Sequence, residues 1–200
     1  RILAICRDLD IDAVGISGVD AGLVRAHRRP PVTMSDGETV DFGFVGDIDA
    51  VDPTVILKLL DNGLMPVISP LSADSHGTLL NINADTVAAA IGAALSAEKL
   101  ILCTGAPGIL ERVEDPSSVI SYTDLRGLKK MREDGSIVDG MLPKAKAIED
   151  AIRGGVRRVH VISYQAPEGI LTEVFTNEGT GTLVVADVNA LTPAEQNASS

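Results

Sequence analysis

The sequence has very few aromatic residues and no tryptophan. Aromatic residues make up 2% of the 200 positions, whereas hydrophobic residues make up 45%. Any core must therefore be built from aliphatic side chains. Cysteine is also rare, with two residues, Cys6 and Cys103, each within an apolar run. We expect two buried, reduced thiols and no disulfide framework, which favours a cytoplasmic protein.

Positive charge is scarce as well. Lys and Arg together number 17 against 28 Asp and Glu, which gives a net charge of −11. Nonspecific nucleic-acid binding requires a basic surface, so we expect no nucleic-acid partner. A phosphate ligand held by a few local cations is still compatible with this balance. No apolar run reaches the roughly 20 residues that cross a bilayer, and the start of the chain does not resemble a signal peptide.

Several motifs of known chemistry are missing. The sequence contains no His/Cys cluster with metal-ligand spacing, and no P-loop, nucleophile elbow or dinucleotide fingerprint. What the sequence does contain is an alternation of short apolar runs with amphipathic segments. The apolar runs, which predict strands, are 13–16, 65–69, 99–103, 158–162 and 183–186. The amphipathic segments, which predict helices, are 2–9, 53–62, 121–133, 144–153 and 167–176.

This alternation is typical of an α/β fold. We predict a three-layer αβα sandwich of helices around a mainly parallel central sheet. Turn-forming residues predict a hairpin or loop at 28–36 and a loop at 71–77. Residues 39–45 are expected to be extended.

Residues 79–95 read LLNINADTVAAAIGAAL, with Asn81, Asn83 and Asp85 at the start of an alanine-rich helix. Asn is a preferred N-cap because its side-chain oxygen accepts a hydrogen bond from a first-turn N–H. The helix dipole favours a carboxylate such as Asp85 in that turn. These residues are therefore either helix caps alone or a polar platform for chemistry, and both interpretations stay open at this point.

The apolar strand at 99–103 is followed by Thr104-Gly105-Ala106-Pro107-Gly108. Ligands of open α/β sheets bind at the carboxyl ends of strands, and small residues let a nucleotide approach the backbone closely. A plain turn explains the same composition.

A second segment, with Gly140, Met141 and Pro143, leads to Lys144 at the start of a helix. A cation opposes the helix dipole at this position. The placement is useful if Lys144 and the helix amides bind an anion such as a transferring phosphoryl group. The alternative is a lysine that extends into solvent.

Three motifs occur together in a fixed order: NINAD at 81–85, KLILCTGAPGIL at 99–110 and DGMLPK at 139–144. This combination closely resembles the amino acid kinase family. Supporting segments are AVGISGVDAGL, VDFGFVGDIDAVDP, LLDNGLMPVISP and EVFTNEGTGT. The resemblance extends to about Asp187 and implies an amino acid kinase-like (carbamate kinase-like) fold.

The resemblance implies phosphoryl transfer from ATP, with Mg2+, to the γ-carboxylate of N-acetyl-L-glutamate in arginine biosynthesis. Catalysis of this type depends on positioning and charge neutralisation. By motif position, Lys144 would neutralise the transferring phosphoryl group and Asp85 would organise the lysines that face it. Asn81 and Asn83 would bind acetylglutamate, and no residue is expected to bind a metal directly. The nucleotide would contact Thr104, Gly105, Ala106, Gly108, Gly140, Met141 and Lys144.

The same resemblance implies an organisation in lobes. Residues 1–97 would form part of the acetylglutamate-binding and dimerisation lobe, residues 98–187 the nucleotide-binding lobe, and residues 188–200 a disordered tail. A homodimer is expected, with a hexamer as the alternative. Glu178 and Gly181 match a motif that lines the inhibitor site of arginine-sensitive relatives, so arginine is a candidate inhibitor.

Two departures from the family pattern leave a second function open. The chain starts inside a predicted helix, so we expect a carboxyl-terminal portion without the family's K-x-G-G element and second catalytic lysine. Gly105 stands where the family usually carries Asp. The alternative to a kinase is therefore a non-catalytic member that binds nucleotide or arginine as a regulatory subunit.

Overall fold

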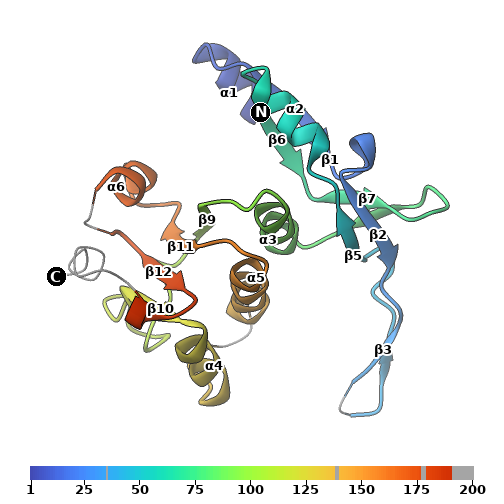
Figure 1. The fold of residues 1–200 in the computed structure, drawn as a ribbon. Helices are drawn as coiled ribbons and strands as arrows, with labels where there is room; N and C mark the ends of the chain where they lie inside the picture. Colours follow the sequence, from blue (N-terminus) through green and yellow to red (C-terminus); the bar gives the residue numbers. More distant parts are fainter. Residues whose placement is uncertain (35, 138–139, 177–178, 191–200) are drawn as a thin grey trace. The chain divides into compact units, whose positions relative to one another are not determined.

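The computed structural model describes residues 1–34, 36–137, 140–176 and 179–190. The chain divides into two compact units, Arg1–Val87 and Ala88–Ser200. Figure 1 shows the elements of both units. The division falls within α3 (Ala84–Ala94). The lobes expected at 1–97 and 98–187 stay a prediction. Of the disordered tail expected at 188–200, residues 188–190 form a 3-10 helix, and residues from 191 onward lie outside the described residues.

The first unit contains a parallel strand pair, β1 (Ala13–Ser17) and β6 (Met65–Ser69), with Ala13 opposite Met65. Helices α1 (Ile2–Asp8) and α2 (Thr54–Asp61) belong to the same unit. The start of α2 is stabilised by Asp52, whose carboxylate accepts hydrogen bonds from the backbone N–H and the hydroxyl of Thr54. These elements confirm the predicted strands and helices.

A second sheet of this unit has the strand order β5-β2-β7-β8. Its strands are β2 (Val24–Arg28), β5 (Gly46–Val51), β7 (Leu71–Ala73) and β8 (Leu79–Asn81). The predicted loop at 71–77 is wrong at its beginning, because residues 71–73 pair with β8 and the hydroxyl of Ser72 donates to the carbonyl of Val24. Tertiary pairing here overrides the turn propensity of Ser and Asp. A hairpin is present near the predicted position, but it extends past 28–36, because β3 (Val32–Thr33) pairs with β4 (Thr39–Val40).

The sheet of the second unit has the order β10-β12-β11-β9. Its strands are β9 (Lys99–Thr104), β10 (Tyr122–Asp124), β11 (Arg158–Ser163) and β12 (Thr182–Val185). Parallel pairs join β9 to β11 and β10 to β12, whereas β11 and β12 run antiparallel. The helices of this unit are α4 (Leu125–Glu133), α5 (Met141–Arg153) and α6 (Gly169–Phe175). The predicted α/β class is confirmed. Two short 3-10 helices, η1 (Asp20–Gly22) and η2 (Val188–Ala190), complete the described elements.

The helix predicted at 121–133 begins later than expected. Residues 122–124 form β10, and Asp124 is the N-cap of α4, where its carboxylate accepts the N–H of Gly127 at 2.8 Å. The difference arises because pairing of residues 122–124 with β12 competes with helix formation.

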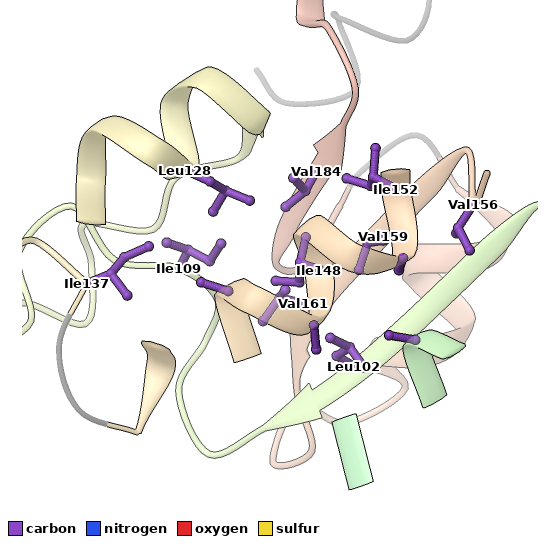
Figure 2. Close-up of a cluster of buried hydrophobic side chains, with 14 residues drawn as sticks. Leu102, Ile109, Leu128, Ile137, Ile148, Ile152, Val156, Val159, Val161 and Val184 are labelled. Carbon is purple, nitrogen blue, oxygen red and sulfur yellow. The ribbon is translucent and has the colours of Figure 1, made fainter. Parts of the chain in front are cut away.

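The core of the second unit is aliphatic, as the composition predicts, and Figure 2 shows its side chains. Ile148 and Ile152 of α5 pack in one cluster with Val159 and Val161 of β11 and with Val184 of β12. All five aromatic residues of the chain are exposed instead: Phe42, Phe44, Tyr122, Tyr164 and Phe175. No helix among the described residues is both long enough and apolar enough to span a bilayer.

Candidate functional site

Three of the predicted site residues lie at the junction of β8 and α3 in the first unit. Asn83 is the helix cap, because its side-chain oxygen accepts the N–H of Thr86 at 3.1 Å. Asp85 is half-buried in the first turn of α3. Asn81 is exposed on β8, where its backbone N–H donates to the carbonyl of Phe44 at 2.8 Å. The capping role is therefore confirmed for Asn83 and does not account for Asn81.

Lys144 is the fourth residue of α5, which begins at Met141 after the N-cap Gly140. Only 9% of Lys144 is exposed, so the interpretation of a solvent-directed lysine is wrong. The first amides of a helix also carry a positive partial charge. Two positive features at one helix end make this turn suited to an anion.

The loop after β9 borders a cavity of about 180 Å3. Three predicted nucleotide-binding residues, Ala106, Gly108 and Met141, line this cavity. The remaining lining residues are Ile109, Leu110, Val113, Ser136 and Ile137. The wall is apolar apart from Ser136, which suits a flat, weakly polar group such as a nucleotide base.

Packing requires glycine at some positions of this region and not at others. At Gly108, a Cβ would lie 2.7 Å from the Thr182 hydroxyl, so close packing requires glycine. At Gly105, a Cβ would lie 3.5 Å from the Tyr164 hydroxyl, which is ordinary contact. At Gly140, a Cβ would have no neighbour within 4 Å, and its φ of −63° suits any residue. Glycine at 105 and 140 is thus not dictated by packing and leaves the backbone open to a ligand.

The predicted arginine-binding residues receive no support as a pair. Glu178 lies outside the described residues. A Cβ at Gly181 would lie 2.1 Å from the carbonyl oxygen of Val161, so the approach of this turn to β11 requires glycine. Packing therefore explains Gly181 without any bound arginine, and the arginine site stays a prediction.

Cys103 was expected to be buried and is exposed. The apolar run predicted a buried strand, but only the face of β9 with Leu100 and Leu102 packs against the core, and Cys103 lies on the opposite face. Cys103 instead lines a cavity of about 230 Å3 together with Ser163 and Tyr164. Cys6 is buried, as predicted.

The sequence pattern did not reveal a buried pair formed by His160 of β11 and Glu173 of α6. Nδ1 of His160 lies 2.6 Å from Oε1 of Glu173, and each residue is only 6% exposed. The Thr180 N–H donates to Oε2 of Glu173 at 2.7 Å, and Nε2 of His160 has no hydrogen-bond partner among the described residues. Burial alone would raise the pKa of Glu173, but the hydrogen bonds from His160 and Thr180 outweigh it and lower that pKa. No spacing rule links these two positions.

The predicted residues thus form two groups, one in each unit. Asn81, Asn83 and Asp85 share the β8–α3 junction, while the loop after β9 and the start of α5 share the apolar cavity. Within the described part of the chain, no group of three His, Cys, Asp or Glu residues could hold a metal ion.

Comparison with known proteins identifies the same family from its sequence profile and from individual relatives. The sequence profile of the amino acid kinase family matches residues 2–163. An acetylglutamate kinase of Myxococcus xanthus is 48% identical over 198 residues, which cover 96% of this chain and 64% of the relative. An acetylglutamate kinase of Symbiobacterium thermophilum is 46% identical over 88% of this chain and 60% of the relative. The chain therefore spans less than two thirds of the length of these relatives.

Among solved structures, N-acetylglutamate synthase from Neisseria gonorrhoeae, complexed with coenzyme A and N-acetyl-glutamate, superposes with a TM-score of 0.77. The match covers 92% of this chain and 40% of that chain, at 23% identity. This similarity concerns the fold alone.

Proposed function

The chain belongs to the amino acid kinase family, and we propose that it is an acetylglutamate kinase. Such an enzyme phosphorylates the γ-carboxylate of N-acetyl-L-glutamate with ATP in arginine biosynthesis. The acceptor is already an anionic nucleophile, so the reaction needs no general base. The protein has to align the two substrates and neutralise the charge of the transferring phosphoryl group.

The observation that carries this proposal is the buried Lys144 in the first turn of α5, the helix whose first residue, Met141, lines the apolar cavity. The cavity wall at Ala106, Gly108 and Met141 would hold the base. Met141 is also the first residue of α5, so a base in this cavity places its phosphates near the helix amides and Lys144. A preorganised cation at that point stabilises the charge that develops on the phosphoryl group.

The residues at the β8–α3 junction would serve the acceptor. Asn81 is exposed and would hydrogen-bond acetylglutamate. The side-chain oxygen of Asn83 is already engaged by Thr86, which leaves its amide N–H groups for the ligand. Asp85 would orient the cations that face the phosphoryl group.

When bound, Mg2+ would offset negative charge on the phosphates of ATP. The described residues offer no cluster of three acidic or imidazole ligands. In this proposal the ion arrives coordinated by the nucleotide phosphates and water, which is a common mode for Mg2+.

The remaining expectations belong to the same proposal. A homodimer, with a hexamer as the alternative, arginine as a candidate inhibitor and a cytoplasmic location are proposed together with the acetylglutamate kinase assignment. The packing reason for glycine at 181 weakens the argument for arginine, because this residue no longer needs a ligand to explain it.

The test is to incubate the 200-residue chain with MgATP, N-acetyl-L-glutamate and hydroxylamine, which traps an acyl phosphate as a hydroxamate. Thermal unfolding with MgADP is measured in parallel, since a ligand at 100 times its Kd adds about 2.7 kcal/mol of stability. We expect hydroxamate that depends on both substrates. Stabilisation by MgADP without hydroxamate would favour the non-catalytic nucleotide-binding subunit. If neither is observed, the proposal is wrong.

A further inference from the structure

The loop at 104–108 has few polar groups with which to hold a nucleotide. Thr104 carries its single polar side chain, because the other four residues are Gly105, Ala106, Pro107 and Gly108. Binding sites that are largely apolar need a small number of placed polar groups to fix the ligand. A ribose presents two hydroxyls, and these require partners close to the loop.

Strand pairing brings such a group to the loop. β9 and β11 are parallel with Ser163 opposite Thr104, and the Tyr164 N–H donates to the Thr104 carbonyl at 3.0 Å. The Tyr164 hydroxyl lies 3.5 Å from the point where a Cβ of Gly105 would be. The Tyr164 hydroxyl therefore lies beside the loop at Gly105, a residue that has no side chain of its own to contact a ligand.

Packing does not explain an aromatic residue at this position. Tyr164 is 68% exposed and borders the 230 Å3 cavity that also involves Cys103 and Ser163. Tyrosine combines an apolar ring with a hydroxyl that needs a hydrogen-bond partner, which is why it is enriched at binding surfaces. Its location at the carboxyl end of a parallel strand is where ligands bind in sheets of this kind.

We propose that the Tyr164 hydroxyl hydrogen-bonds to the ribose of the bound nucleotide. This inference rests on the proposed nucleotide site. In that site the base enters the apolar cavity lined by Ala106 and the phosphates lie at Lys144. The sugar, which links them, then passes over the loop beside Tyr164.

The experiment measures MgADP binding to the full chain by isothermal titration calorimetry. Tyr164→Phe removes the hydroxyl and keeps the ring, so the fold is preserved; an unchanged melting temperature without ligand checks this. Loss of one neutral hydrogen bond predicts roughly 3- to 10-fold weaker binding. Tyr122→Phe is the matched control, since Tyr122 is the other tyrosine, lies on β10 and is 42% exposed. It should bind as the wild type does.

Two further ligands locate the contact. With 2′,3′-dideoxy-ADP, which lacks the ribose hydroxyls, the wild type and Tyr164→Phe should bind equally. With tripolyphosphate, which lacks base and sugar, they should also bind equally. The inference is overturned if Tyr164→Phe binds ADP as tightly as the wild type does. It is also overturned if the substitution weakens binding of 2′,3′-dideoxy-ADP or tripolyphosphate as much as it weakens binding of ADP. A wild-type chain that fails to bind ADP contradicts the proposed nucleotide site itself.

Discussion

Nδ1 of His160 lies 2.6 Å from the carboxylate of Glu173, and the two residues join β11 to α6 inside the second unit. Glu173 also accepts a hydrogen bond from the backbone N–H of Thr180. The carboxylate of this α6 residue is therefore hydrogen-bonded to both β11 and the turn before β12. Because both residues are 6% exposed, these hydrogen bonds are shielded from water. A buried carboxylate that loses such partners is strongly penalised.

This geometry predicts an acid-dependent loss of stability. The pKa of Glu173 is below its ordinary value of 4.5 in the folded chain. A depressed folded pKa contributes stability above the unfolded pKa, and that contribution is lost as pH falls through the folded pKa. Glu173→Gln should lower the free energy of unfolding by roughly 1–3 kcal/mol at pH 7. The difference between variant and wild type should shrink below about pH 4.5.

Urea unfolding at pH 7, 5 and 4 measures this difference. Glu133→Gln is the control, because Glu133 is exposed and pairs with Lys129 at 3.7 Å on the surface of α4. A Glu173→Gln deficit that stays constant across the three pH values would contradict the prediction.

The outline of the fold could be predicted from the sequence where local signals were strong. β6 has the predicted bounds, and β1, β9 and β11 each begin at the predicted residue and end one residue later than predicted. β5 was missed because Asp47 and Asp49 interrupt its apolar character. In the structure these carboxylates pair with Arg29 and His27 across the strands, which the sequence does not reveal.

The candidate site was predictable only in part, for a similar reason. The motifs pointed to Ala106, Gly108 and Met141, which do line one cavity. They could not reveal the pairing of His160 with Glu173 or the position of the Tyr164 hydroxyl beside Gly105, since each depends on strand and helix packing. Gly181 shows the converse, because a residue predicted to bind a ligand is explained by a close backbone approach.

Lys144→Met tests the role of the buried cation. Met keeps the aliphatic stem and removes the charge, so the core around α5 should be retained. Loss of a cation that stabilises the transferring phosphoryl group should lower kcat by about 10²- to 10³-fold in the hydroxamate assay. Lys146→Met is the matched control, because Lys146 is exposed on the same helix and pairs with Asp150. Equal turnover in both variants would remove Lys144 from the site.

Gly181→Ala distinguishes a packing glycine from a ligand-binding glycine. The new Cβ would collide with the Val161 carbonyl, where backbone atoms have little room to move, so a loss of roughly 1–3 kcal/mol is expected. Gly105→Ala is the control, since its Cβ meets the Tyr164 ring at ordinary contact distances. Its stability should change by less than about 1 kcal/mol. Chemical denaturation measures both, and a fully stable Gly181→Ala protein would return the residue to the list of ligand-binding candidates.

Alanine substitutions at Asn81 and Asn83 distinguish helix capping from ligand binding. Asn83→Ala removes the acceptor of the Thr86 N–H, so the free energy of unfolding should fall by about 1 kcal/mol. Asn81 is exposed and makes its strand contact through the backbone, so Asn81→Ala should leave stability nearly unchanged. If Asn81 binds acetylglutamate, its removal should raise KM for that substrate, by roughly 5- to 10-fold for one lost hydrogen bond. An unchanged KM in Asn81→Ala, combined with the expected stability loss in Asn83→Ala, would mean that this junction caps a helix and does not bind the acceptor.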